Sequence, residues 1–142
     1  MSQDCDPFDF DDVAILEIVR MFAHPDLPNG VCLIELSFTE GQVFVAVDDR
    51  TDDLICSRTL PEVGFACRRP FPTSFWDPVI GLSLITAWQM TNNRGYRDAV
   101  QLRFRARPSE GPYTLVQLYG EASQIVLGEV KEIRRASMGQ SG

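Results

Sequence analysis

The sequence predicts a mainly β protein. One antiparallel sheet of about eight strands closes into a small barrel, roll or sandwich, with at most one or two short helices. Apolar and polar residues alternate with a period of two along most of the chain, as in half-buried strands. Short segments rich in glycine, aspartate and asparagine separate these runs and are typical of turns. The 142 residues, 44% of them hydrophobic, suffice for one domain with its own core.

The first run, VAILEIVRMFA at residues 13–23, fits two patterns. Its apolar residues could line one face of a helix that Asp11 or Asp12 caps. They also alternate as in a strand, with Ile15 and Val19 on the same face. The length of the segment and its β-branched residues favour the strand.

The next two runs, GVCLIELSF and GQVFVAV, predict a β-hairpin. With a two-residue turn at Glu40 and Gly41, Phe38 faces Val43, and six apolar side chains share one buried face. These six are Ile34, Leu36, Phe38, Val43, Val45 and Val47. An acidic turn at residues 48–53 then leads to a short strand, LICSRTL.

The segment after this strand, residues 61–78, holds four of the nine prolines. Proline lacks the backbone donor of a strand and biases the preceding residue to extended geometry, so the segment predicts a long ordered loop. We expect its aromatic residues to pack onto the sheet, with Trp76 partly exposed. Loops of this length are often functional.

The runs VIGLSLITAWQMTN and YRDAVQLRFRARP predict a second hairpin. A three-residue loop at 93–95 ends in a glycine, which takes left-handed geometry without steric cost. The pairs in this register are Leu84 with Phe104, Trp88 with Val100, and Met90 with Asp98. Trp88 is then buried, while Asp98 lies among apolar side chains and needs a partner there, either structural or from a ligand.

Two final strands follow, YTLVQLYGEAS and QIVLGEVKEI. A turn at PSEGP pairs Arg105 with Leu115 and Arg103 with Gln117. The side chains of Arg103, Arg105 and Arg107 then share one strand face. This face is either solvated and partly paired, or a site for an anion or an acidic peptide, because guanidinium groups suit carboxylates and phosphates.

One motif carries a resemblance. The segment WQMTNNRGYRD, residues 88–98, is similar to a WxMTNxxGYxD hairpin of small bacterial domains grouped as a family of unknown function. In that family an acidic turn precedes the hairpin, and VDDRTDD at residues 47–53 matches that turn in outline. The resemblance implies a bacterial origin and no particular activity.

Charge and composition limit the classes of partner and the cellular location that we expect. The net charge of −7 disfavours nucleic acid and anionic membranes as partners. The acidic N-terminus has neither the basic flank nor the apolar stretch of a signal peptide, so we expect a cytoplasmic protein whose thiols are reduced. We expect residues 1–12 to form a disordered acidic tail, 13–136 a single β-rich domain, and 137–142 a disordered C-terminal tail.

No group of residues predicts an enzyme or a cofactor. His24 is the only histidine, the four cysteines show no C-x-x-C spacing, and no nucleotide-binding glycine motif is present. We therefore expect a non-enzymatic protein-interaction module of an immunity or accessory type. Two partners are left open: a basic protein and, in a homodimer, a second copy of the chain. The alternative is a small-ligand-binding barrel with an aromatic-lined pocket, and a hydrolase using Cys67 or Asp98 ranks last. The candidate binding residues are Trp76, Phe75, Tyr96, Asp98, Arg103 and Arg105.

Overall fold

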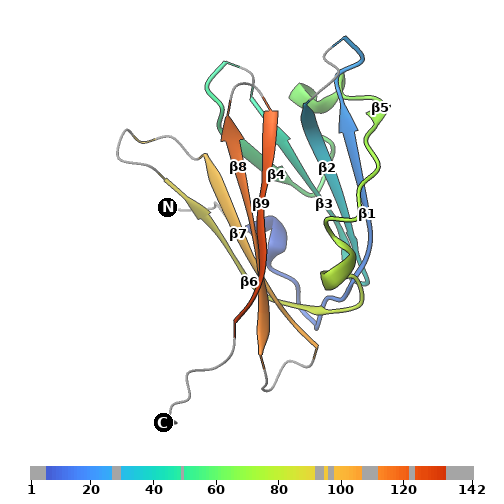
Figure 1. Cartoon of the computed structure of the whole chain (residues 1–142), viewed down its shortest axis with the longest axis vertical. Coiled ribbons are helices and arrows are strands. Elements are labelled where there is room, and N and C mark those ends of the chain that lie inside the picture. Colours follow the sequence, from blue (N-terminus) through green and yellow to red (C-terminus); the bar gives the residue numbers. More distant parts are fainter. Residues whose placement is uncertain are drawn as a thin grey trace.

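The computed structural model describes residues 6–26, 30–48, 50–91, 95, 98–106, 112–121 and 124–133. In this part the protein is mainly β, as predicted, and its antiparallel strands form a curled half-barrel (Figure 1). The strands are β1 Leu16–Ala23, β2 Val31–Phe38, β3 Gly41–Val47, β4 Leu54–Ser57, β5 Arg69–Pro70, β6 Ser83–Met90, β7 Ala99–Arg105, β8 Tyr113–Glu121 and β9 Gln124–Ile133. Three 3-10 turns accompany them: η1 Asp6–Phe8, η2 Glu62–Gly64 and η3 Asp77–Val79. The first run is therefore a strand, β1, as the β-branched residues predicted.

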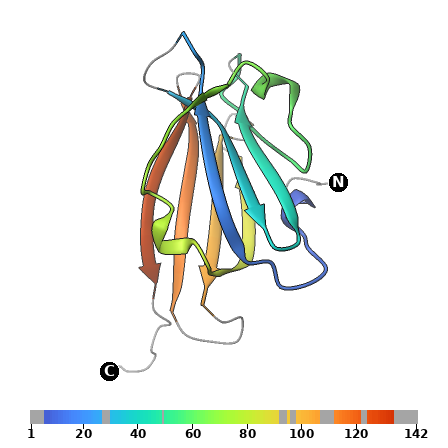
Figure 2. The same cartoon turned by 90° about the vertical axis from the view of Figure 1, so that its right-hand side faces the viewer.

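The strands form two halves, β1 to β4 and β6 to β9 (Figures 1 and 2). Within each half, neighbours in sequence pair antiparallel, with β1 on one edge of β2 and β3 on the other. The halves meet at one end where Val31 of β2 pairs with Ile125 of β9. At the other end, Ile15 forms an isolated bridge with Ser83 of β6.

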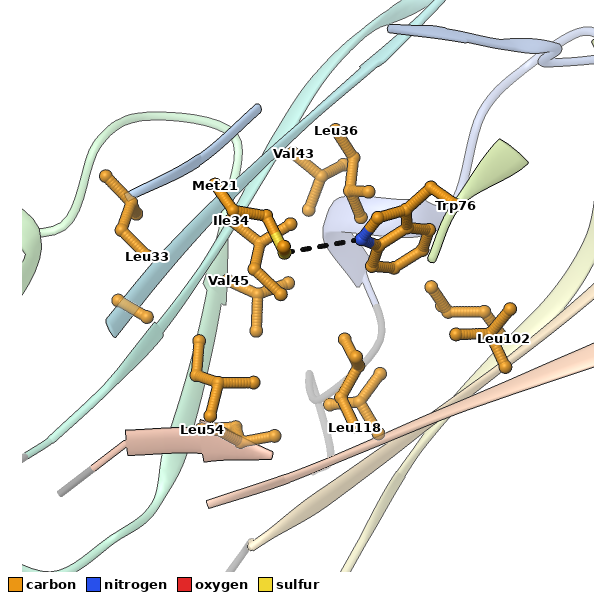
Figure 3. Close-up of a cluster of buried hydrophobic side chains, with 14 of the residues drawn as sticks. Met21, Leu33, Ile34, Leu36, Val43, Val45, Leu54, Trp76, Leu102 and Leu118 are labelled. Atoms are coloured by element: carbon orange, nitrogen blue, oxygen red, sulfur yellow. Dashed lines mark hydrogen bonds between the residues drawn. The ribbon is translucent and has the colours of Figure 1, made fainter. Parts of the chain in front are cut away.

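The inward side chains of both halves form one core (Figure 3). Its fully buried members come from strands on both sides, among them Ile34, Val45, Leu102 and Leu118. Each such side chain stabilises the fold by about 1.5–3 kcal/mol relative to leaving it in water. Trp76 completes this core, and its indole N–H donates a hydrogen bond to the Sδ atom of Met21 over 3.4 Å.

The register of the first hairpin differs from the prediction by two residues. Leu36 pairs with Val43 and Phe38 with Gly41, so the turn consists of Thr39 and Glu40. Gly41 begins β3 with a φ of 145°, which side-chain-bearing residues rarely adopt, and this places the turn one residue earlier. A shift of two preserves the face of every side chain, so the six predicted inward residues are all buried.

The β7–β8 register likewise differs from the prediction by two residues. Arg103 pairs with Leu115 and Arg105 with Tyr113. Because the shift is again even, both arginines keep the outward face that the alternation predicted.

The second hairpin contains a bulge that reverses one prediction. Leu84 pairs with Phe104 as predicted, but the register shifts before Thr86, and Trp88 then pairs with Gln101 instead of Val100. A one-residue slip turns the following side chains to the opposite face, so Trp88 points outward and is 39% exposed. The prediction that Trp88 is buried is wrong for this reason. The predicted loop at 93–95 lies outside the described residues except for Gly95, whose φ is 87°.

The proline-rich segment is ordered as predicted, but it contains η2, β5 and η3. Trp76 is only 3% exposed, so the prediction that it is partly exposed is wrong. Its carbonyl oxygen accepts hydrogen bonds from the N–H groups of Val79 and Ile80, and the indole lies in the core. A disulfide joins Cys67 of this segment to Cys32 of β2, so the prediction of reduced thiols is wrong for these two residues. Cys56 lies half-buried in β4, outside this disulfide.

Residues 6–12 pack against the first half of the molecule. Phe8 is buried, and the Phe10 ring lies 5.2 Å from the Phe38 ring. The Arg58 guanidinium lies 4.3 Å from the centre of the Phe10 ring and donates hydrogen bonds to the carbonyl oxygens of Pro7 and Asp9. The two phenylalanines among the aspartates thus anchor this segment to the first half.

Candidate functional site

The outer face of β6, β7 and β8 gathers arginine and aromatic side chains, and we call it the arginine–aromatic face. Its members are Trp88, Gln101, Arg103, Arg105, Tyr113 and Tyr119. They share the face because side chains alternate along a strand and these residues occupy outward positions in paired strands. Trp88 joins them only because of the bulge in β6, since the predicted register placed it in the core.

Arg103 lies at the centre of this face between two rings. Its guanidinium carbon is 4.7 Å from the centre of the Trp88 ring and 4.3 Å from that of Tyr113. The guanidinium carbon of Arg105 lies 5.8 Å from the same Tyr113 ring. These distances are within the range of cation–π attraction. The rings therefore hold Arg103 in place, and its buried Nε atom has no hydrogen-bond partner among the described residues.

Two rings on this face are exposed to solvent. Trp88 is 39% and Tyr119 is 37% exposed, and the Tyr119 hydroxyl donates a 2.6 Å hydrogen bond to Oε1 of Gln117. Tryptophan, tyrosine and arginine are the residues that most often dominate protein–protein binding energies. The face thus combines anchor side chains with a fixed cation.

The six candidate binding residues do not form one site. Arg103 and Arg105 lie together on the arginine–aromatic face, whereas Trp76 and Phe75 lie on the segment that closes the core and contact each other edge to face at 5.3 Å. Asp98 precedes β7, and its backbone carbonyl accepts a hydrogen bond from the N–H of Gly120. Met90 pairs with Ala99 and not with Asp98 as predicted. Tyr96 lies outside the described residues.

A groove of about 550 Å³ runs along β1, and we call it the β1 groove. Residues 17–22 of β1 form one wall, and residues 70–73, 76, 77 and 80 form the other. Trp76 and Met21, which lie together in Figure 3, both line it. The sequence could indicate the apolar residues of β1 but not the groove, which depends on where the proline-rich segment lies.

Hydrogen bonds within the acidic turn at residues 48–53 hold its conformation. Oδ1 of Asp48 accepts hydrogen bonds from the backbone N–H of Arg50 at 3.0 Å and from its Nε at 3.4 Å. The backbone hydrogen bond is the main reason that the pKa of Asp48 lies below its ordinary value, and the Arg50 side chain lowers it further. Asp49 lies outside the described residues. The turn thus uses its Asp48 carboxylate for its own backbone.

His24 and Cys67, two residue types that often act in catalysis, make structural contacts in this protein. Nδ1 of His24 accepts a 3.0 Å hydrogen bond from the N–H of Asp26, and Cys67 is in the disulfide, so the proposed Cys67 nucleophile is excluded in this state. Among the described residues, no three His, Cys, Asp or Glu side chains are grouped so as to hold a metal ion.

Fold and surface together define a mainly β half-barrel with an arginine–aromatic face, and no helix in the described part is long and apolar enough to cross a membrane. The chain belongs to a family of unknown function, DUF6334, whose profile matches residues 1–134. This agrees with the resemblance to a family of unknown function, while a shared 88–98 motif and a bacterial origin stay predictions. No curated protein and no solved structure matches the chain.

Proposed function

We propose that this protein is a non-enzymatic interaction module, of an immunity or accessory type, that binds its partner through the arginine–aromatic face. The observation that supports this most is the Arg103 guanidinium, held between Trp88 and Tyr113 at 4.7 and 4.3 Å. Ordering an arginine in advance lowers the entropy that is lost on binding. Exposed Trp88 and Tyr119 on the same face supply apolar contact area.

The partner's charge follows from two effects of different range. The net charge of −7, with aspartates concentrated at residues 48–53, attracts a basic protein during approach. At contact, the planar donors of Arg103 pair best with carboxylates, and salt screens everything beyond about 8 Å. We therefore propose a basic partner that places an acidic patch against the arginine–aromatic face.

A photo-cross-linking experiment tests this surface. Tyr119 is replaced by benzoylphenylalanine, and Phe65, 59% exposed, carries the same group as a control elsewhere on the molecule. We expect one dominant adduct from cells at position 119, absent at position 65, and lost in the Arg103→Ala background. The mass of the adduct distinguishes a second copy of this chain from another protein. Equal labelling at both positions, or labelling that Arg103→Ala leaves unchanged, would exclude this face.

The β1 groove supports the second candidate, a small-ligand-binding protein. Its volume of about 550 Å³ falls within the range of small-molecule sites, and Trp76 is among the residues that line it. Binding of an apolar fluorescent dye, displaced by native metabolite extract and weakened by Ile80→Asp, would favour this candidate. The cytoplasmic location also stays a proposal, and the state of the Cys32–Cys67 bond in cells tests it, because reducing compartments do not maintain such bonds.

A further inference from the structure

We propose that the open edge of β1 binds an extended, basic segment of another protein as an added β-strand. This site goes beyond the proposed function, since it lies on the other half of the molecule and shares no residue with the arginine–aromatic face. The inference rests on three observations: an edge that the described residues pair at its two ends but not between them, an apolar groove beside that edge, and carboxylates along the groove.

The edge of β1 is closed at both ends. At one end, the N–H of Leu16 donates to the carbonyl of Leu82, and the carbonyl of Leu16 accepts from the N–H of Gly81. At the other end, β1 pairs with β5, and the carbonyl of Met21 accepts from the N–H of Phe71. Residues 17–20 lie between these contacts, and on this edge they have no backbone partner among the described residues.

Val19 presents its backbone groups at this open edge. The directions of the N–H and C=O groups alternate along an antiparallel strand, so residues two apart face the same neighbour. Because the carbonyl of Met21 points away from β2, the N–H and C=O of Val19 also point away from β2. An extended peptide can therefore exchange two hydrogen bonds with Val19, as in strand addition to a sheet edge.

The space beside this edge suits a peptide. The segment after β5 runs beside β1 before it turns into η3 (Figure 2), and the β1 groove of about 550 Å³ lies between them. Ile18 and Ile80 on its two walls are 47% and 39% exposed, which is unusual for isoleucine. Alternate apolar side chains of an added strand would cover them and remove apolar surface from water.

Charge selects a basic segment. Glu17 and Asp77 line the groove with exposed side chains, and no ion pair involves either of them among the described residues. The one basic residue of the lining, Arg20, donates to Oε2 of Glu35 at 3.4 Å across β1 and β2. The groove thus has an acidic balance, and lysine or arginine at every second position of a bound strand would compensate it.

A competing interpretation is that Glu17 and Arg20 only protect an edge strand from aggregation, as charged side chains often do. That function requires charge and no groove. It does not account for two exposed isoleucines facing a cavity of this size, so we favour the binding site.

Binding of defined peptides tests the proposal. The probe is a blocked, fluorescein-labelled hexapeptide that alternates arginine with valine, titrated against the full chain at low salt. The first control carries N-methyl groups on every second amide, which removes strand donors but keeps charge and side chains. The second control replaces arginine by glutamate. We expect saturable binding, a loss of about tenfold on N-methylation, since the peptide N–H that donates to the Val19 carbonyl is removed, and no binding of the glutamate peptide.

Variants locate the site. Val19→Pro removes the N–H at the open edge, where proline is tolerated because no ladder bond is lost, and Val19→Ala is the matched control that keeps it. We expect Val19→Pro to weaken peptide binding about tenfold relative to Val19→Ala. Glu17→Gln with Asp77→Asn should weaken it about threefold and reduce its salt dependence.

Three results would overturn the proposal. The first is that the N-methylated peptide binds as tightly as the unmodified one. The second is that folded Val19→Pro binds the peptide as tightly as Val19→Ala. The third is that an apolar dye binds in the groove and the peptide does not. The first two mean charge attraction without strand addition, and the third means a small-ligand site. Arg103→Ala should leave peptide affinity unchanged, so the cross-linking result at the arginine–aromatic face and this result can fail independently.

Discussion

Gly120 of β8 lies against the backbone of Asp52, so close that a Cβ atom at Gly120 would stand 2.0 Å from the Asp52 carbonyl oxygen. Its N–H also donates to the carbonyl of Asp98 over 2.8 Å. Nearby, the side-chain amide of Gln89 donates to the carbonyl of Leu54. Here the turn before β4 meets the second half of the molecule, and only a residue without a side chain allows this approach.

Gly120→Ala should therefore lower the free energy of unfolding by about 3 kcal/mol, because backbone atoms cannot move aside as side-chain ends can. Gly64→Ala is the control, since its Cβ would meet only the methyl ends of Leu33 and Leu60 at 3.2 and 3.3 Å. Urea denaturation of both variants measures the difference. Equal stability of the two variants would show that the halves are not joined at Gly120.

Gly95 provides a test of backbone strain without crowding. Its φ is 87°, and no atom of the described residues lies within 4 Å of a Cβ at this position. Gly95→Val should cost about 1–2 kcal/mol because β-branched residues disfavour this conformation, whereas Gly95→Asn should cost much less. Thermal melts compare the two. An unchanged melting temperature in Gly95→Val would mean that this position tolerates other backbone angles.

The two tryptophans should differ in solvent access. In Trp76→Phe the remaining Trp88 is 39% exposed, and acrylamide should quench its fluorescence readily. In Trp88→Phe the remaining Trp76 is 3% exposed, and quenching should be several times weaker. The sequence alone predicts the opposite result, so this measurement separates the two arrangements.

The sequence predicts which face of the sheet a side chain occupies better than it predicts which residues lie beside it. Alternation correctly placed the inward residues of β2 and β3 and the outward Arg103 and Arg105, because register errors of two leave faces unchanged. The bulge before Thr86 cannot be seen in the alternation of apolar and polar residues. It places Trp88 outside the core and beside Arg103. Trp76 was misplaced because a proline-rich segment resembles a surface loop when its contact with Met21 is unknown.

The disulfide could not be predicted for a related reason. Cys32 and Cys67 are 35 residues apart in sequence and show no spacing motif, and their proximity depends on the path of the whole 61–78 segment. The β1 groove depends on the same path. The part of the candidate sites that follows from local pattern was therefore predictable, and the part that follows from long-range packing was not.

Breaking this disulfide should destabilise the protein strongly. Closing a loop of 35 residues stabilises the folded state by about 4 kcal/mol in the chain-entropy description. The double variant Cys32→Ser, Cys67→Ser should lose about that amount, and a reducing agent should affect the wild type but not the variant. Cys56→Ser, outside the disulfide, is the control and should retain sensitivity to the reducing agent. A wild-type protein whose unfolding is the same with and without reductant would mean that the bond contributes nothing.

The turn at 48–53 should make stability depend on pH in the acid range. Hydrogen bonds from Arg50 hold the pKa of Asp48 below its ordinary value of about 3.8, and its side chain is only 16% exposed. Because the folded pKa is the lower one, the charged carboxylate stabilises the fold above pH of about 4, and this contribution is lost as the pH falls through the folded pKa.

Asp48→Asn keeps the shape but removes the charge. It should be less stable than wild type at pH 7, with the difference vanishing towards pH 2. Asp12→Asn, at an exposed residue outside the turn, removes the same charge and is the control for the change in net charge. Urea denaturation at a series of pH values measures both, and a difference for Asp48→Asn that is independent of pH would exclude the carboxylate as its cause.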